Sequence, residues 1–501
     1  MTEMARDPVV QLRDGAVRGT VSAGVAAFLG IPYAAAPFGA NRMRAPQAVL
    51  AWDGERDATA FGPTVPKGDY PPQYAPLFPE VVIAGEECLN LNVWTPDPAA
   101  RPGLPVLVWI HGGAFMNGSS SVADYDGAAF ARDGVVCVSI NYRLAAEGSL
   151  YLDDGVANLG LLDQLAALRW VQDNIAAFGG DPARVTVAGE SAGAMSVTTL
   201  LSMPLASGLF AQAIAQSGAG AHTLPPAEAL MVARYLAEAL GVPADREAIK
   251  AVPLDKLVRA ASDLVVEVQT NPDPARWGQL MLSLLPFAPT VDGVILPEAP
   301  VAGLAAGQGS GVRLLIGSNR DEARLFLVAA ATIGLIDEPT LAIVAGAYGL
   351  SGDGLAVYRD NRPGASPGDL MAALVSDWFF RVPAIRVAET RVAAGAAGTW
   401  MYRFDYPEPA DNHGYGAAHA VEVPFAFDTL DRNQSPALMG DAPSQAVADR
   451  VHRIWVDFIT RGDPGWVPYD TGRRTTGLLT EDVLVVDDPA ADERVLWEGI
   501  R

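Results

Sequence analysis

The stretch Val185-Thr186-Val187-Ala188-Gly189-Glu190-Ser191-Ala192-Gly193 decides which fold we expect. Its first three residues are β-branched, as in a short strand, and residues 194–201 keep apolar side chains at helical intervals. At a sharp strand-to-helix corner of the form Gly-x-Ser-x-Gly, the serine hydroxyl projects into a site. The flanking glycines are needed because no Cβ fits where the backbones of strand and helix nearly touch. The stretch therefore predicts that Ser191 is a nucleophile.

The composition is that of a globular protein with an acidic surface. Of 501 residues, 50% are hydrophobic and 19% are charged, which supplies ample material for a core. The formal net charge of −23 argues against nucleic-acid partners and against anionic membrane surfaces. Solubility is the ordinary explanation of this acidity. The alternative, steering of cationic substrates, requires a specific cation site.

Cysteine usage and the hydropathy of the chain indicate the compartment. The chain has two cysteines, and Cys137 lies in the apolar run 135–140, where we expect a free, inert thiol in a buried strand. Residues 1–7 contain no apolar signal region. The longest nearly apolar run, 325–336, is far shorter than the ~20 residues that span a bilayer. We therefore expect a cytoplasmic protein without a membrane partner.

The pattern along the chain predicts one large α/β domain over residues 1–501, because strand-like apolar runs alternate with helical patterns and no repeat or linker interrupts them. Near-continuous apolar runs are typical of strands buried on both faces of a parallel sheet. The Pro- and Gly-rich stretch 63–79 reads as a surface loop. The predicted strands cover 104–110, 135–140, 184–189, 313–317 and 399–404, and helices are predicted at 161–178 and around 447–458.

A nucleophilic serine needs a histidine to take its proton and a carboxylate to orient the imidazole. In α/β-hydrolases these groups follow one another in the order serine, acid, histidine. Asp321 and Glu322 directly follow the predicted strand 313–317, and His413 and His419 share a glycine-rich loop. A loop carboxylate paired with a neighbouring arginine is the plain alternative for either acid. Chemistry alone leaves both choices open.

Two further features bear on this constellation. His452 lies in the predicted C-terminal helix, where a partly exposed helical histidine is the ordinary explanation. The turn 111–115 follows the strand 104–110 and contains a Gly-Gly pair. Backbone N–H groups of such a turn, together with the N–H after the nucleophile, can stabilise an oxyanion. We favour this role over that of a simple structural turn.

The chain resembles the type-B carboxylesterases, the family that includes bacterial para-nitrobenzyl esterases, carbamate-cleaving esterases and cholinesterases. The resemblance spans nearly the whole chain, and it is highly specific because several independent motifs occur in the right order. They are Phe28-Leu29-Gly30-Ile31-Pro32-Tyr33-Ala34, Glu86 to Trp94, His111 to Phe115, Asn141-Tyr142-Arg143-Leu144, Phe178 to Pro182, Gly189 to Gly193, Asn319 to Glu322 and His419 to Phe425.

The resemblance implies an α/β-hydrolase fold, with a large, mostly parallel central sheet, flanking helices and long insertions around an active-site gorge. It implies Glu322 rather than Asp321 as the acid, and His419 rather than His413 as the base. It further implies that the oxyanion N–H groups belong to Gly113, Ala114 and Ala192, and that Glu190, His111 and Ser217 support the site. It implies no metal and no cofactor.

The chain also departs from the family pattern. Ala323 and Ala420 stand where the family usually has glycine, or a polar residue in the second case, and since both are small we expect altered loop detail with activity retained. Secreted members bridge the cysteine that matches Cys88 to an upstream cysteine, which this chain lacks. The stretch 66–87 contains no tryptophan of the kind that binds quaternary ammonium in cholinesterases, which argues against a choline-ester specialist.

From these observations we expect a serine hydrolase that cleaves small-molecule carboxylic esters through an acyl-enzyme. Candidate substrate-pocket residues are Phe115, Leu325 and Phe326, with ordinary core packing as the alternative for the last two. An amidase or aryl carbamate hydrolase would use the same triad. A non-catalytic binding protein is the remote alternative, since such relatives lack part of the triad. The sequence leaves open whether the protein is a monomer or a small homo-oligomer.

Overall fold

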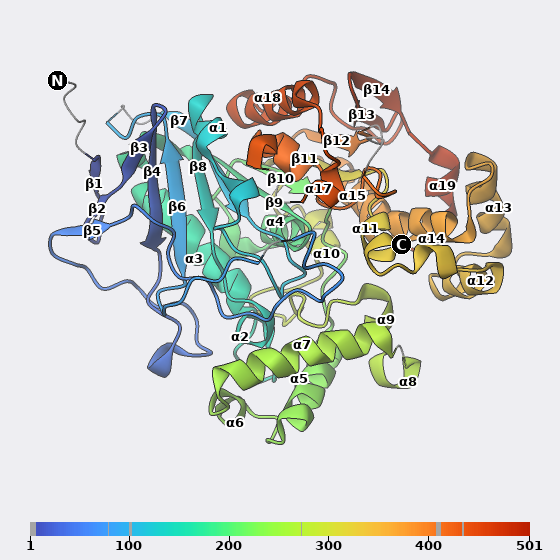
Figure 1. Ribbon diagram of the computed structural model, residues 1–501, viewed down its shortest axis with the longest axis horizontal. Coiled ribbons are helices and arrows are strands. Elements are labelled where there is room, and N and C mark those ends of the chain that lie inside the picture. Colours follow the sequence, from blue (N-terminus) through green and yellow to red (C-terminus); the bar gives the residue numbers. More distant parts are fainter. Residues whose placement is uncertain (1–6, 79, 100–102, 272, 407–411, 433–434) are drawn as a thin grey trace.

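A large twisted sheet forms the centre of the protein (Figure 1). The computed structural model describes residues 7–78, 80–99, 103–271, 273–406, 412–432 and 435–501. Within them, 11 strands follow the order β14-β13-β12-β11-β10-β9-β7-β8-β6-β4-β3. Their bounds are β3 Thr20–Ser22, β4 Val25–Pro32, β6 Asn90–Thr95, β7 Leu104–Ile110, β8 Val136–Ile140, β9 Gly180–Glu190, β10 Gln212–Gln216, β11 Arg313–Asn319, β12 Thr399–Phe404, β13 Thr475–Leu479 and β14 Val483–Asp487.

The middle of this sheet is parallel and its margins are antiparallel. All neighbours from β8 through β7, β9, β10, β11 and β12 to β13 pair in parallel, whereas β14, β6, β4 and β3 join antiparallel. The predicted mostly parallel sheet is confirmed. A separate small sheet contains β1 (Val9–Gln11), β2 (Ala16–Arg18) and β5 (Glu55–Asp57).

Helices cover both faces of the sheet, and β7 shows why the strands are apolar throughout. Val106, Val108 and Ile110 point into one hydrophobic cluster, which is shared with the helices α3 (Leu159–Asn174), α4 (Ala192–Ser202) and α15 (Val382–Ala393). The alternate residues Leu107 and Trp109 point into a second cluster, which is shared with α1 (Ala128–Arg132), α16 (Val423–Phe427) and α18 (Gln445–Arg461). Because side chains alternate along a strand, a strand buried on both faces needs apolar residues at every position.

The bounds of the helices complete the description. The α-helices are α1 Ala128–Arg132, α2 Ala145–Ser149, α3 Leu159–Asn174, α4 Ala192–Ser202, α5 Pro226–Leu240, α6 Arg246–Lys250, α7 Leu254–Thr270, α8 Pro274–Trp277, α9 Leu280–Ser283, α10 Pro300–Ala305, α11 Arg324–Ala329, α12 Glu338–Ala347, α13 Gly352–Asn361, α14 Pro367–Ser376, α15 Val382–Ala393, α16 Val423–Phe427, α17 Pro436–Met439, α18 Gln445–Arg461 and α19 Ala491–Leu496. The 3₁₀ turns are η1 Gly39–Asn41, η2 Ala123–Tyr125, η3 Ile175–Phe178, η4 Pro204–Ala206, η5 Ile333–Leu335 and η7 Leu430–Arg432, and η6 (Asp377–Arg381) is a π-helix.

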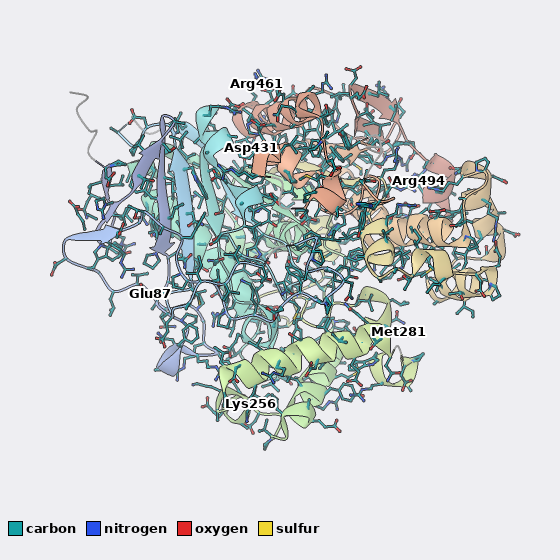
Figure 2. All side chains as sticks on the ribbon, viewed as in Figure 1. Glu87, Lys256, Met281, Asp431, Arg461 and Arg494 are labelled. Carbon is teal, nitrogen blue, oxygen red and sulfur yellow. The ribbon has the colours of Figure 1, made fainter. Side chains whose placement is uncertain are left out.

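Two groups of helices lie beside the sheet. One group, α5 to α9, lies below the sheet in the view of Figures 1 and 2 and includes Lys256 and Met281. The other, α12 to α14 with α19, has its own hydrophobic cluster around Tyr358 and Trp497. Among the described residues no single helix is both long and apolar enough to cross a membrane, although α12 and α13 pass that test as a pair bent by 117°.

The parallel strands bring the predicted site residues to one edge of the sheet. In the register of the sheet, Ile110 at the end of β7 pairs with Gly189 of β9, and Gln216 of β10 pairs with both Glu190 and Gly317. The carboxyl ends of β7, β9, β10 and β11 are therefore level with one another. In open α/β sheets ligands bind at this edge.

Candidate active site

Ser191 lies at a strained corner between β9 and α4. Its backbone has φ 56° and ψ −124°, a combination that L-residues rarely adopt. Its N–H donates to the carbonyl of Gln216 at 2.9 Å, which holds the corner against β10. A Cβ on Gly193 would lie 2.0 Å from the Ile110 carbonyl oxygen, and one on Gly189 would lie 2.6 Å from the Gly193 carbonyl carbon. The predicted need for both glycines is confirmed.

The structure brings His419 together with Glu322. Nδ1 of His419 lies 2.6 Å from Oε2 of Glu322, and the other carboxylate oxygen accepts a 2.7 Å hydrogen bond from the backbone N–H of Asn319. An ionised carboxylate only accepts hydrogen bonds, so Nδ1 carries the hydrogen and Nε2 is left as the basic nitrogen. Both side chains are buried.

The two alternatives left open by the sequence lie elsewhere. Asp321 pairs with Arg320 at 2.8 Å and accepts a 3.0 Å hydrogen bond from the backbone N–H of Ala417. Its carboxylate therefore holds the loop that contains His419 through a hydrogen bond to the loop backbone. His413 is exposed at the start of that loop, with φ 52°. Glu322 and His419, the acid and histidine that the family resemblance implies, are the pair in contact with each other.

Glu190 lies on the other side of the imidazole. Its Oε1 is 3.1 Å from Nε2 of His419, although the two are not aligned for a hydrogen bond. Glu190 directly precedes Ser191, so the imidazole contacts the side chain of the residue before the serine corner. Glu422, three residues after His419, is a third buried carboxylate here and accepts a 2.6 Å hydrogen bond from the Asn319 amide.

The charges of this cluster shift the pKa of each member. Burial alone would lower the pKa of His419, but Glu190 and Glu322 outweigh it and raise the pKa to about 9. Burial raises the pKa of Glu190 to about 8, and His419 partly offsets that effect. Burial, with the nearby Glu322, raises the pKa of Glu422 to about 6. The cluster therefore holds protons near neutral pH.

The turn after β7 presents backbone N–H groups. Gly113 has φ 111° and Ala114 has φ 55°, and their N–H groups donate to none of the residues that the structure describes. Ala192 is the first residue of α4, where a backbone N–H has no partner within the helix. A Cβ on Gly112 would lie 3.1 Å from the Ser191 Cβ, so the turn lies against the corner. The turn that contains Gly113 and Ala114 therefore lies next to the corner that contains Ser191 and Ala192.

Aromatic side chains form the wall beside His419. The ring of Phe326 is 5.6 Å from the imidazole and is 36% exposed, so part of its surface is open to contact with a substrate. The predicted residues Leu325 and Phe115 are both buried in hydrophobic clusters, which leaves them little surface for a substrate. Phe380 is closer to the imidazole, at 4.7 Å, and was not predicted. At 2% exposed it is as buried as Leu325 and Phe115, so it backs the imidazole rather than offering open surface.

Phe380 lies on the π-helix η6, in the run Asp377-Trp378-Phe379-Phe380-Arg381. Such π-helical turns are rare and are frequently found at functional sites. The run reads as ordinary apolar helix in the sequence, so no local signal distinguishes Phe380 from Phe379. Phe379 instead stacks on His222, with ring centroids 4.0 Å apart.

Ser217, His111 and His452 were also considered in the sequence, and the structure shows the surroundings of each. Ser217 is buried with φ 54°, but its hydroxyl has no partner among the described residues and does not bridge to Glu322. His111 stacks on Tyr142 and is buried, and burial lowers its pKa to about 3. The expectation of a partly exposed His452 was wrong: it is 3% exposed, because α18 packs it against α16 and Asp133.

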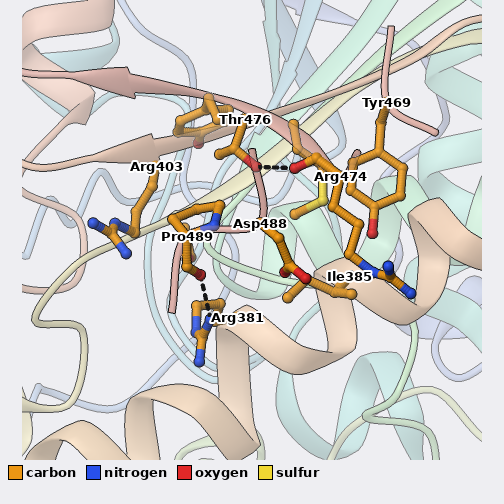
Figure 3. A pocket seen from close by; sticks show the side chains of 11 residues that line it. Arg381, Ile385, Arg403, Tyr469, Arg474, Thr476, Asp488 and Pro489 are labelled. Carbon is orange, nitrogen blue, oxygen red and sulfur yellow. Dashed lines mark hydrogen bonds between the residues drawn. The ribbon is translucent and has the colours of Figure 1, made fainter. Parts of the chain in front are cut away.

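Two cavities lie near these elements. One, of about 50 Å³, adjoins Ala420 and is lined by Tyr70, Phe78, Tyr125 and Val423 among others. The other, of about 20 Å³, lies behind β11, β12 and β13 among Arg381, Arg403, Arg474, Asp488 and Tyr469 (Figure 3). That volume is about the size of one water molecule. The arginines there pair with Asp377, Asp405 and Glu389, so the second cavity is structural.

No group of three or more His, Cys, Asp or Glu that could hold a metal ion occurs in the part of the chain that the structure describes. Cys88 and Cys137 are both buried and free, and Cys137 lies in β8 as predicted. Burial raises the pKa of the Cys88 thiol to about 12. Neither thiol has the low pKa of a nucleophile.

Comparison with known proteins identifies the family. The model of the Carboxylesterase family matches residues 6–343 and 349–476. The chain belongs to this family. The carboxylesterase fold is also that of solved relatives: the carboxylesterase EST55 of Geobacillus stearothermophilus superposes with a TM-score of 0.85 at 37% identity, over 98% of this chain and 99% of the other.

Curated relatives cover nearly the same length. The para-nitrobenzyl esterase of Bacillus subtilis (strain 168) is 36% identical over 97% of both chains. The phenmedipham hydrolase of Pseudarthrobacter oxydans is 35% identical over 92% of this carboxylesterase and 91% of its own length. The fumonisin B1 esterase of Sphingopyxis macrogoltabida is 34% identical over 90% of this chain and 82% of its own.

Proposed function

We propose that this carboxylesterase hydrolyses carboxylic esters of small molecules, with Ser191 as nucleophile, His419 as base and Glu322 as the orienting acid. The observation that carries the proposal is the 2.6 Å contact between Nδ1 of His419 and Glu322, beside a serine held at a strained corner. The similarity to relatives named as esterases supports the same reaction class.

In the first half of the reaction, Ser191 Oγ attacks the ester carbonyl carbon while Nε2 of His419 takes its proton. The carbonyl oxygen becomes an oxyanion, which accepts hydrogen bonds from the N–H groups of Gly113, Ala114 and Ala192. Each such donor contributes on the order of 3 kcal/mol to transition-state stabilisation. The bond to the alcohol then breaks, and the imidazolium protonates the leaving oxygen.

In the second half, water attacks the acyl-enzyme. His419 takes a proton from that water, and the resulting intermediate collapses to the free acid and to Ser191 with its proton restored. Glu322 keeps its contact with Nδ1 throughout, which maintains the tautomer and stabilises the imidazolium. Every step is an acid–base or acyl-transfer step of side chains and backbone N–H groups of this chain.

The experiment that tests the proposal is turnover of a graded p-nitrophenyl ester series from acetate to decanoate. A p-nitroanilide of matched acyl length and an aryl carbamate are measured in parallel, and Ser191→Ala serves as the control. We expect fast ester turnover that is lost in Ser191→Ala, with weak anilide cleavage. Preferred cleavage of the anilide or carbamate would assign the protein to the amidase alternative. No turnover of any of these substrates would contradict a catalytic role.

A further inference from the structure

Asn117 connects a long loop to the turn 113–117, which contains the candidate oxyanion residues Gly113 and Ala114 and is called the oxyanion turn below. The turn closes on itself, because the backbone N–H of Asn117 donates to the Gly113 carbonyl at 2.9 Å. The side chain of Asn117 extends in the opposite direction. Its Nδ2 donates to the Gly68 carbonyl at 2.7 Å and to Oε2 of Glu80 at 3.1 Å. One buried residue therefore contacts the turn through its backbone and the loop through its side chain.

The loop in question runs from residue 64 to residue 83, residue 79 lying outside the described residues. Its ends are joined, since Thr64 N–H donates to the Ile83 carbonyl at 3.0 Å and Ile83 N–H donates to the Thr64 hydroxyl at 3.0 Å. The sequence suggested a surface loop over 63–79. Its described residues 63–78 contain no helix or strand, as predicted, and most of them are half-buried or exposed.

A buried ion pair tightens this loop. Nζ of Lys67 lies 3.1 Å from Oε1 of Glu80 and donates to the Val81 carbonyl at 2.9 Å, and the Lys67 side chain is 1% exposed. The same Glu80 carboxylate accepts from Asn117. Both partners of the Asn117 amide are acceptors, so the orientation of the amide is settled and both of its N–H groups are used. Loss of this amide would leave the Gly68 carbonyl and Oε2 of Glu80 without this donor, while Oε1 of Glu80 would keep its contact with Lys67.

The loop also contacts the wall next to His419. The ring of Tyr74 lies 6.3 Å from that of Phe326, which is 5.6 Å from the imidazole. The loop thus contacts the aromatic side chains beside His419 through Tyr74 and the oxyanion turn through Asn117.

We propose that Asn117 is a positioning residue that couples the loop 64–83 to the geometry of the oxyanion turn, so that the N–H groups of Gly113 and Ala114 are aligned only while the loop is in place. The kinetic test of this inference rests on the proposed ester hydrolysis. The hydrogen-exchange test is independent of it.

The kinetic test compares Asn117→Ala with the wild type on one p-nitrophenyl ester and on a trifluoromethyl ketone. The ketone forms a tetrahedral adduct whose oxyanion needs the turn. We expect kcat and the affinity for the ketone to fall together by at least ~10-fold. This is smaller than the roughly 10²- to 10³-fold loss in kcat that follows removal of a complete oxyanion hydrogen-bond donor. KM should change by less than about threefold. An unchanged ketone affinity would overturn the inference.

A reversed pair provides the matched control. In Asn117→Asp the carboxylate faces Glu80, so we expect a larger loss than in Asn117→Ala. In the double variant Asn117→Asp/Glu80→Gln a donor and an acceptor again face each other at position 80, and the introduced carboxylate keeps a negative charge in the vicinity of Lys67. The Gly68 carbonyl still lacks its donor, so kcat should recover only part of that loss. If the double variant is as impaired as the sum of its single changes, Asn117 does not act through Glu80.

The structural readout is hydrogen exchange in the free protein. Asn117→Ala should raise exchange together in the loop 64–83 and in the turn 113–117, because the two are coupled. Faster exchange in only one of these segments would overturn the coupling. This measurement holds whatever the substrate is. If the wild type fails to turn over esters but exchange rises in both segments, the proposed function falls and the coupling stands.

Discussion

Nε2 of His419 lies 3.1 Å from Oε1 of Glu190, the residue immediately before the candidate nucleophile. The other imidazole nitrogen contacts Glu322, so a single buried ring lies between two buried carboxylates. Opposite charges at this distance favour the protonated imidazole. Since a general base must be neutral to accept a proton, this arrangement links the activity of the site to pH.

The first prediction concerns this pH dependence. Glu190 raises the pKa of His419, so replacing it by the neutral Glu190→Gln should lower that pKa. The acid limb of kcat/KM reports the histidine losing its proton, and it should therefore move to lower pH in the variant. The measurement is a profile of kcat/KM from about pH 5 to pH 10 with a neutral ester.

The matched control for this prediction is Glu87→Gln. Glu87 pairs with Arg56 at the surface, and its removal should leave the acid limb in place. An acid limb that stays put or moves to higher pH in Glu190→Gln would show that Glu190 does not act on His419 electrostatically.

The second prediction separates the two adjacent acids. Glu322→Gln removes the charge that stabilises the imidazolium, and we expect kcat to fall by about 10³- to 10⁴-fold. Asp321→Asn retains an oxygen to accept the Ala417 N–H, so kcat should fall by less than about tenfold. Steady-state kinetics on a p-nitrophenyl ester measures both. Equal losses in the two variants would contradict the assignment of Glu322.

The third prediction concerns the backbone contact beneath the corner. In Gly193→Ala the new Cβ would lie 2.0 Å from the carbonyl oxygen of Ile110, a backbone atom that cannot move without displacing β7. We expect a loss of stability of at least ~1–3 kcal/mol together with loss of activity. Thermal unfolding and yield of folded protein measure this.

Gly346→Ala is the control for that substitution. Gly346 lies within α12 with open space around its Cβ position, and alanine is favoured over glycine in a helix interior by about 1 kcal/mol. The melting temperature should therefore stay the same or rise. A Gly193→Ala protein as stable and active as Gly346→Ala would disprove the close approach of strand and helix.

The fourth prediction concerns substrate size. Phe380 lies 4.7 Å from the His419 ring, so Phe380→Ala should enlarge the space beside the base and shift the optimum of the p-nitrophenyl series to longer acyl chains. Phe379→Ala, its neighbour on the same π-helix, removes a ring that stacks on His222 instead. Its optimum should stay that of the wild type. An identical shift in both variants would point to disruption of η6 rather than to a pocket wall.

Local patterns in the sequence predicted the elements and the nucleophile. The strands expected at 104–110 and 399–404 have those bounds in the structure, because continuous apolar runs suit strands buried on both faces. The Ser191 corner was also predictable from local sequence. A tight strand-to-helix turn requires small residues directly beside the serine, and these are its neighbours in the chain.

The family motifs also predicted site residues that are far apart in the chain, but only the tertiary structure shows which of them are in contact. Glu322 and His419 are 97 residues apart, and chemistry alone left Asp321 and His413 as alternatives. Only packing shows that Asp321 supports the loop 412–419 while Glu322 faces the imidazole.

By itself, then, the sequence determined the α/β sheet, the strained serine and the candidate acid–histidine region, since each follows from short-range pattern or from motifs. The tertiary structure alone decided the contact of Glu190 with His419, the place of Phe380 in the wall, the burial of His452 and the connection through Asn117. The physical reason is that burial, ring contacts and charge interactions depend on distances between elements, and these distances arise from the way the elements pack against one another.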